Sequence, residues 1–233
     1  AGALAALVIG LLIALPALRL SGLYLAMATV AFAQTASWVF LHWDNGTGGA
    51  TGIRVAPVAY PFGVPSAYGH YYLCLLVACA VVAMAISLKR SRIGRSFVAI
   101  RESEVGAETL AINVTRTKTT AYAVGAVLAG LAGGLFAPLL GLVVPESYDM
   151  AQVILQFAMV IVGGLGSIVG AVIGAIALVW MQEWLRAFKE LQEIAFGAMI
   201  LGTILFLPGG AVGLIQKWLP SWREPVSRKV VRR

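Results

Sequence analysis

Apolar residues run along this chain in long blocks, and short polar connections separate the blocks. A helix needs about 20 mostly apolar residues to cross a hydrocarbon core of about 30 Å. Strands of a membrane barrel would instead alternate apolar and polar positions over about 10 residues, and these blocks do not alternate. The pattern predicts an all-α, polytopic bundle of transmembrane helices with about seven spans: Ala1–Leu18, Gly22–Leu41, His70–Leu88, Thr119–Gly141, Ala151–Leu165, Ile168–Leu185 and Ile194–Leu207.

Composition supports a membrane protein and argues against a nucleic-acid-binding one. The 233 residues are 60% hydrophobic and only 12% charged, whereas soluble domains have about 25% charged residues. The net charge of +7 comes from basic clusters beside apolar spans, which is the positive-inside pattern with some attraction to anionic membrane lipid. No nucleic-acid partner and no cofactor are expected. No metal site is expected either, because His42 and His70 have no other ligand-type residue at coordinating distance along the sequence.

The basic residues also predict the orientation of the spans. The connection from Lys89 to Lys118 holds seven Lys and Arg residues, and the tail from Pro208 holds six. The connection from His42 to Gly69 holds Arg54 alone, and the one from Leu142 to Met150 holds none. Placing the two basic segments in the cytoplasm puts residue 1 outside. Because the chain begins without Met or a basic leader, we expect upstream helices to be missing from it.

Residues 89–118 interrupt the apolar pattern with charged residues that retain helical character. Arg101 is spaced to face Glu104 and Glu108 on a helix, and Asn113 and Thr115 can cap the next helix. Such a segment can lie on the membrane, dock against a partner, or form a stiff loop. A helix on the membrane surface carries Lys and Arg on its polar face, but this segment is acidic in its middle. The charges therefore favour docking to a cytosolic partner.

Small residues recur every four positions in two spans. Ala126, Gly130 and Gly134 form one row, and Gly166, Gly170 and Gly174 form the other. Such rows let helix backbones approach closely in lipid. Packing inside the bundle is the simpler interpretation, and a surface for self-association is the alternative.

Polar residues within the spans are candidates for a substrate path. Gln34 and Thr35 lie in the second span and Gln156 in the fifth. Intramembrane polar groups often line a pathway, although Thr and Ser also bond to their own helix backbone. The spans have no deep ionisable residue of the kind that proton- or sodium-coupled transporters use. A stand-alone secondary transporter remains the rival hypothesis.

Several stretches, in order along nearly the whole chain, resemble one family. They are LPALRLSGLYLAMATVAFAQ (Leu15–Gln34), TGGATGI (Thr47–Ile53), the segment from SRIGRSFVAIRESEVGAETLAINVTRTK into the following span, PESYD (Pro145–Asp149), VGGLGSIVGAVIGA (Val162–Ala175) and FLPGGAVGL (Phe206–Leu214). The chain is similar to LivM-like permease subunits of branched-chain amino-acid ABC importers. The resemblance implies one permease domain over residues 1–233, with a cytoplasmic coupling segment at 89–118 and a basic cytoplasmic tail at 208–233.

The resemblance also implies partners and roles. A second permease subunit completes the path, two cytosolic ATPase subunits supply energy, and an extracytoplasmic binding protein delivers substrate at the bacterial cytoplasmic (inner) membrane. The chain itself lacks a phosphate-binding P-loop, so ATP hydrolysis is expected in the partners. The coupling segment is assigned to Arg101, Glu102, Glu104, Glu108 and Ala111. Relatives usually carry Gly where Ala111 stands, and alanine favours a continued helix over a turn. Urea, short amides and other amino acids remain alternative substrates.

Overall fold

The computed structural model describes residues 2–18, 23–56, 58, 66–148, 150–164, 166–185, 197, 201–202 and 213. Within these ranges the fold is almost entirely helical, with one short pair of strands. The chain divides into two compact units, 1–148 and 149–233. Each unit is described by itself.

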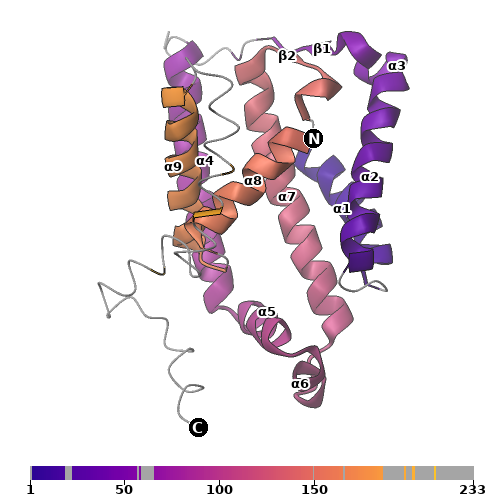
Figure 1. The fold of residues 1–233 in the computed structure, drawn as a ribbon, viewed down its shortest axis with the longest axis vertical. Coiled ribbons are helices and arrows are strands. Elements are labelled where there is room, and N and C mark those ends of the chain that lie inside the picture. Colours follow the sequence, from indigo (N-terminus) through magenta and orange to yellow (C-terminus); the bar gives the residue numbers. More distant parts are fainter. Residues whose placement is uncertain are drawn as a thin grey trace. The chain divides into compact units, whose positions relative to one another are not determined.

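The first unit is built on four long helices (Figure 1). They are α1 (Gly2–Ala17), α2 (Leu23–His42), α4 (Ser66–Arg90) and α7 (Val114–Leu140). Two short helices, α5 (Arg92–Glu102) and α6 (Glu104–Thr109), connect α4 to α7. The described residues of this unit also form α3 (Asp44–Thr47), β1 (Ile53–Arg54), β2 (Leu142–Val143) and the 3₁₀ turns Gly49–Thr51 and Pro145–Tyr148.

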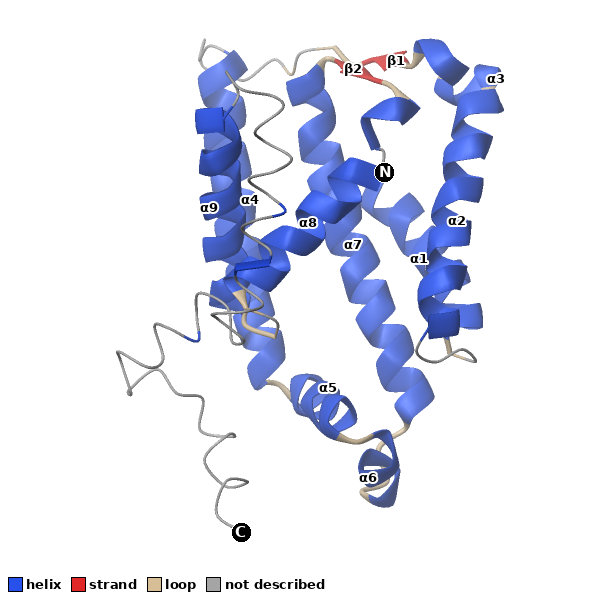
Figure 2. Cartoon of the chain, viewed as in Figure 1, coloured by secondary structure: helices blue, strands red, loops and turns tan. Residues whose placement is uncertain are grey.

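The connections of the first unit gather at two opposite ends (Figure 2). At one end, β1 pairs antiparallel with β2, with Ile53 opposite Val143 and Arg54 opposite Leu142. At the other end, α5 and α6 join the ends of α4 and α7. The two connections poor in Lys and Arg therefore meet at one end, and the richly basic connection lies at the other. This is the arrangement that alternating transmembrane spans require.

Small residues let α1 and α7 pack closely in antiparallel fashion. A Cβ added at Gly130 would lie 2.6 Å from Ala6 Cβ and 2.9 Å from the carbonyl oxygen of Gly2. A Cβ added at Gly10 would collide with Ala126 Cβ. Gly134 differs, because no atom of another described helix lies within 4 Å of the position its Cβ would take. The α1 contact therefore uses Ala126 and Gly130 from the predicted row and leaves Gly134 open.

A side-chain hydrogen bond adds to the contact between α4 and α7. His70 Nε2 lies 2.9 Å from the carbonyl oxygen of Leu135. Because a carbonyl oxygen only accepts, Nε2 donates in this bond. The bond links residues 65 positions apart near the end of the unit that carries β1 and β2.

The second unit contains a tight helical hairpin of α8 (Met150–Gly163) and α9 (Ile168–Leu185). Gly163 approaches the carbonyl oxygen of Gly170, and Gly174 approaches that of Met159, so closely that neither contact has room for a Cβ. Ala158, Val162 and Leu178 form a buried cluster between the helices. Gly166 is not on this face: it lies in the turn with φ of 85°, a conformation that L residues avoid. The row expected from the sequence therefore begins at Gly170, because α9 begins at Ile168.

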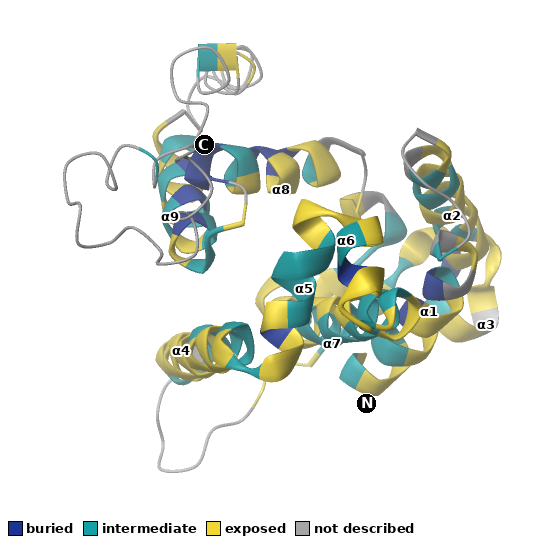
Figure 3. Cartoon of the chain, turned by 90° about the horizontal axis from the view of Figure 1, so that it is seen from below, coloured by how far each residue is buried: buried dark blue, intermediate teal, exposed yellow. Residues whose placement is uncertain are grey.

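Many large apolar side chains outside these contacts are exposed. Figure 3 shows how much of the helices is coloured as exposed (yellow). Two helical stretches among the described residues, Tyr68–Arg90 and Val114–Leu140, are long and apolar enough to cross a membrane. Gly2–Ala14, Gln152–Gly163 and Ile168–Trp184 are shorter apolar stretches. The first six predicted spans each correspond to one helix. The seventh, Ile194–Leu207, and the tail at 208–233 lie almost wholly outside the described residues, so a total of seven spans stays a prediction.

Candidate functional site

Two serine caps determine how the charged segment 89–118 folds. Ser91 Oγ accepts from the amide of Gly94 (3.2 Å) and begins α5, and Ser103 Oγ accepts from the amide of Gly106 (3.0 Å) and begins α6. Ser103 has an extended backbone, with φ of −161° and ψ of 120°, so it also ends α5. The continuous helix expected through Arg101 and Glu104 is therefore wrong. Serine competes for backbone donors and favours caps over helix interiors, and the two Ser-x-x-Gly patterns were the signal for it.

The turn from α4 into α5 depends on a glycine. Gly94 is buried, and a Cβ there would collide with the carbonyl oxygens of Leu88 and Lys89. These are backbone atoms, which cannot rotate away as a flexible side chain can. α5 can therefore leave the end of α4 at a sharp angle (Figure 1).

The end of α6 is a reverse turn built on alanine. The Ile112 amide donates to the carbonyl of Ala107 (3.1 Å), and the Ala111 amide donates to that of Glu108 (2.9 Å). These two bonds make a Schellman motif, which requires a left-handed residue after the helix. Ala111 supplies it with φ of 58°. The general preference of alanine for a continued helix does not prevail here, because the two bonds satisfy the last carbonyls of α6 only if the chain turns.

Asn113 then begins α7, as the sequence predicted. Its Oδ1 accepts from the amide of Arg116 at 2.9 Å. The four residues from Leu110 to Asn113 thus stop one helix and start the next, which fixes α6 directly below the first turn of α7 (Figure 1).

The charged residues of this region have different environments. Glu104 Oε1 accepts from Lys118 Nζ at 2.7 Å, which joins α6 to α7. Arg101, Glu102 and Glu108 are exposed, and none of them forms an ion pair with another described residue. The apolar side chains of Val105 on α6 and of Leu110, directly after α6, are also exposed, at 73% and 71%. A short helix that presents carboxylates and large apolar side chains together is typical of a surface that a partner covers.

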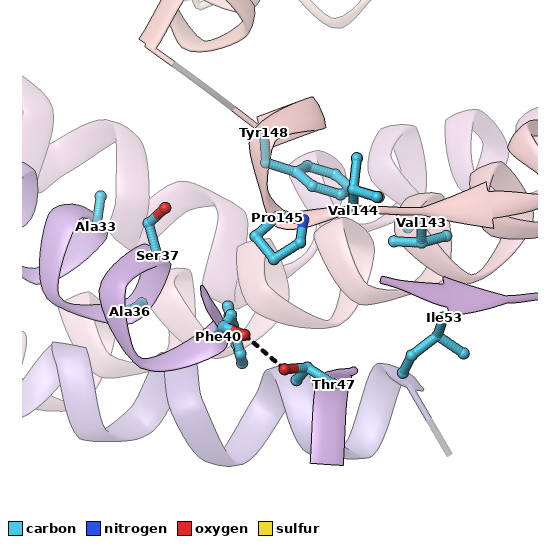
Figure 4. A pocket seen from close by; sticks show the side chains of 11 residues that line it. Ala33, Ala36, Ser37, Phe40, Thr47, Ile53, Val143, Val144, Pro145 and Tyr148 are labelled. Carbon is cyan, nitrogen blue, oxygen red and sulfur yellow. Dashed lines mark hydrogen bonds between the residues drawn. The ribbon is translucent and has the colours of Figure 1, made fainter. Parts of the chain in front are cut away.

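A second feature lies at the opposite end of the first unit. A cavity of about 510 Å³ lies between α2, α7 and the chain around β1 and β2 (Figure 4). Its walls are mainly apolar, with side chains such as Phe40, Ile53 and Val143, and with hydroxyls from Ser37, Thr47 and Tyr148. Thr47 Oγ1 donates to the carbonyl oxygen of Phe40 at 2.5 Å, which connects α3 to the end of α2.

The three residues suggested for a substrate path do not line this cavity. Thr35 Oγ1 donates to the carbonyl of Ala31 in its own helix (2.8 Å), which is the alternative that the sequence left open. Gln34 is exposed on α2, next to Ala33 and Ser37, which do line the cavity. Gln156 is exposed on α8 in the second unit. The residues of α2 that do line the cavity are Ala33, Ala36, Ser37 and Phe40. They lie on one face of the helix, and this face cannot be recognised from the sequence because the whole helix is apolar.

Among the residues that the structure describes, no three His, Cys, Asp or Glu side chains come together as metal ligands would. Cys74 and Cys79 are both free thiols on α4. The described residues offer apolar surfaces, helix caps and the ion pair between Glu104 and Lys118.

Comparison of the sequence with known proteins assigns the chain to a family. The family described as "Branched-chain amino acid transport system / permease component" matches residues 1–207. The high-affinity branched-chain amino acid transport system permease protein LivM of Salmonella typhimurium is 31% identical over 235 residues, which cover 90% of this chain and 55% of that protein. A second relative is the high-affinity branched-chain amino acid transport system permease protein LivH of Escherichia coli (strain K12). It is 31% identical over 136 residues, which cover 58% of this chain and 44% of that protein.

A relative outside amino-acid transport is also similar. The autoinducer 2 import system permease protein LsrC of Yersinia enterocolitica is 30% identical over 139 residues, covering 56% of this chain and 39% of that protein. The chain spans about half the length of the LivM proteins it matches. No solved structure matches it significantly. The chain belongs to the family of permease components of branched-chain amino acid transport systems.

Proposed function

We propose that this chain is a transmembrane permease subunit of an ATP-driven ABC importer that moves branched-chain amino acids into the bacterial cell. Family membership and the names of the LivM and LivH relatives support the substrate class. One observation supports the coupling role most directly: α6 presents exposed side chains, and the Glu104–Lys118 salt bridge joins α6 to the long helix α7. One similar protein is named as an import permease for a different solute, autoinducer 2. Urea, amides and other amino acids therefore stay as alternative substrates.

The partners follow from this role. A second permease subunit, two cytosolic ATPase subunits and an extracytoplasmic binding protein complete the importer in the cytoplasmic membrane. Residues 1–233 act as one permease domain, in which 89–118 couples to the ATPases and 208–233 forms a basic cytoplasmic tail. The chain contributes no catalytic residue of its own in this scheme, and hydrolysis of ATP takes place in the ATPase subunits.

The docking surface lies at the α5–α6 junction and on α6. Glu102 and Glu108 provide exposed carboxylates for basic groups of an ATPase, and Val105 and Leu110 provide exposed apolar area in the same segment. Ala111 fixes where α6 ends and so fixes the orientation of this surface. Glu104 has a different task, because its carboxylate already bonds to Lys118 and connects the docked helix to α7. Arg101 borders the same surface at the end of α5.

The proposed mechanism is alternating access. The bundle has two arrangements, and docked ATPases bias the balance between them as they close and open. Movement of an ATPase pulls α6, and the Glu104–Lys118 bond and the cap at Asn113 transmit it to α7. Gln34, Thr35 and Gln156 remain candidates for the substrate path. The mainly apolar cavity beside α2 offers walls compatible with an aliphatic side chain.

Charge reversal at Glu108 tests the docking surface. The complete importer would be expressed with tagged permease, and the amount of ATPase that copurifies would be measured together with substrate uptake. Glu108→Lys should lower ATPase recovery by about tenfold, since truncating or reversing a charge at an interface typically costs 1–2 kcal/mol or more. Asp44→Lys is the matched control, because Asp44 is an exposed carboxylate at the opposite end of the unit.

The results separate two functional classes. Loss of ATPase with Glu108→Lys and retention with Asp44→Lys would support the importer. Normal copurification and normal uptake with both variants would refute the docking surface. Uptake by the permease without any ATPase would favour a stand-alone secondary transporter instead.

A further inference from the structure

The division of segment 89–118 into two helices separates its charges. α5 carries Arg92, Arg95 and Arg101 against the single acid Glu102, whereas α6 carries Glu104 and Glu108 and no basic residue. The acidic middle that argues against a membrane-surface role therefore belongs to α6. α5 has the opposite character: it is basic and amphipathic, which is the pattern of helices that lie on anionic membranes.

The apolar side of α5 faces a small cavity. Phe97 and Ile100, both half-buried, line a space of about 200 Å³ together with Thr117, Lys118 and Ala121 of α7. The sixth lining residue is Arg101, which has no carboxylate partner within the described part of the chain. Lys118, at the same cavity, is bonded to Glu104. The cavity is lined almost entirely by apolar atoms, and Arg101 and Lys118, which contribute to it, are basic. An apolar space beside basic residues matches the two ends of a phospholipid.

The position along α7 agrees with this ligand. Lys118 is the last charged residue before Glu146, and the helix is uncharged from Thr119 to Leu140. The cavity spans Thr117 to Ala121 on α7, so it lies where the charged connection meets the hydrocarbon core, at headgroup depth. Figure 3, seen from the α5–α6 end, shows α5 lying across the end of α7 with its middle residues half-buried.

We infer that the groove between α5 and α7 is a binding site for one anionic phospholipid, with its phosphate on Arg101 and its acyl chain against Phe97, Ile100 and Ala121. Basic pockets beside spanning helices on the cytoplasmic side bind anionic headgroups in this way. The inference goes beyond the proposed transport role and needs only that the chain lies in a membrane. α5 thereby holds the segment to the bilayer while α6 remains available to a partner.

Lipid retention by the intact protein tests this site. The permease, purified with its copurifying subunits, would be exchanged into neutral detergent micelles with equal amounts of phosphatidylglycerol and phosphatidylcholine, and bound lipids would be counted by native mass spectrometry. The unmodified protein should prefer phosphatidylglycerol. Arg101→Gln should reduce that preference about fivefold, the effect expected for one basic residue near a membrane surface.

Two further variants make the result specific. Arg95→Gln removes the same charge from an exposed position of α5 that does not line the groove, and it should keep the preference. Ala121→Leu fills the apolar floor without changing charge, and it should lower retention of both lipids at this site. Equal loss with Arg95→Gln and Arg101→Gln would overturn the site in favour of diffuse surface attraction.

The remaining outcomes also decide the question. Release of phosphatidylglycerol by millimolar inorganic phosphate would show a simple phosphate site and would overturn the lipid assignment. An unchanged lipid preference in Arg101→Gln, together with lower ATPase recovery, would assign the groove to the partner instead. Because both readouts come from the same sample, failure of the lipid site and failure of the docking surface are distinguishable.

Discussion

Ala111 holds a backbone conformation that L residues adopt only at an energetic cost. Its φ of 58° allows the two reverse-turn bonds that end α6, and the cost of the left-handed region for a residue with a Cβ is about 1 kcal/mol. Glycine avoids this cost because it has no Cβ. The end of the coupling helix is therefore less stable than the same turn would be with glycine.

Ala111→Gly should make the end of α6 harder to open. Removing about 1 kcal/mol of strain should slow hydrogen exchange at the Ile112 amide, which bonds to Ala107, about fivefold. Exchange followed by mass spectrometry on the purified importer would measure it. Ala99→Gly, within α5, is the control and should speed local exchange, because glycine destabilises helix interiors. Unchanged or faster exchange in Ala111→Gly would contradict the strain.

Single residues also decided where the sequence-based prediction failed. Ser103 looks like an ordinary polar residue inside a helical pattern, and periodicity does not reveal that it both ends α5 and caps α6. Arg101 and Glu104 consequently lie on different helices, and Glu104 bonds to Lys118 across 14 positions instead. The capping role of Asn113 was predictable because it stands directly before an apolar span.

At the scale of whole helices, long apolar blocks gave reliable predictions. Six of the predicted spans correspond to helices with ends near the expected ones, because length and hydrophobicity leave few alternatives in a bilayer. Packing partners were not predictable in this way. Gly130 and Gly134 look equivalent in the sequence. Among the residues that the structure describes, however, only Gly130 lies against another helix, since which part of α7 meets α1 depends on the three-dimensional arrangement.

This pair of glycines offers a matched test of the α1–α7 contact. Gly130→Ala places a Cβ 2.6 Å from Ala6 Cβ and 2.9 Å from backbone atoms of α1, so α1 must shift. Overpacking of this kind costs about 1–3 kcal/mol. Thermal unfolding of the purified protein in detergent should therefore occur at a lower temperature. Gly134→Ala, which meets nothing within 4 Å, should leave the unfolding temperature unchanged or raise it slightly.

The two glycine variants also test the alternative role of the row. If Gly134→Ala lowers the stability of the assembled importer but not that of the isolated chain, the open half of the row contacts another subunit. Equal effects of both substitutions on the isolated chain would contradict the packing that the structure describes.

For the molecule as a whole, the distribution of charge predicted more than any single motif. The connection with seven basic residues and the two connections poor in them lie at opposite ends of the first unit. The pairing of β1 with β2 was not predictable, because two strands of two residues have no periodicity to recognise. The cavity beside them is likewise formed by residues far apart in the sequence, from Ala33 to Tyr148.

The bond between Glu104 and Lys118 is the proposed route by which movement at α6 reaches α7. Both side chains are partly exposed, at 57% and 28%, so solvent screens the pair and its contribution to stability should be under about 1 kcal/mol. Glu104→Lys should nevertheless lower the amount of substrate transported per ATP hydrolysed several-fold, because two positive charges then face each other between α6 and α7. The double variant Glu104→Lys with Lys118→Glu restores opposite charges and should recover most of the coupling.

The ratio of substrate transported to ATP hydrolysed in proteoliposomes measures this coupling directly, with copurified ATPase as the control for docking. If the single variant keeps the normal ratio, or if the double variant recovers nothing, transmission does not depend on this ion pair, and the covalent connection through Asn113 must carry it alone.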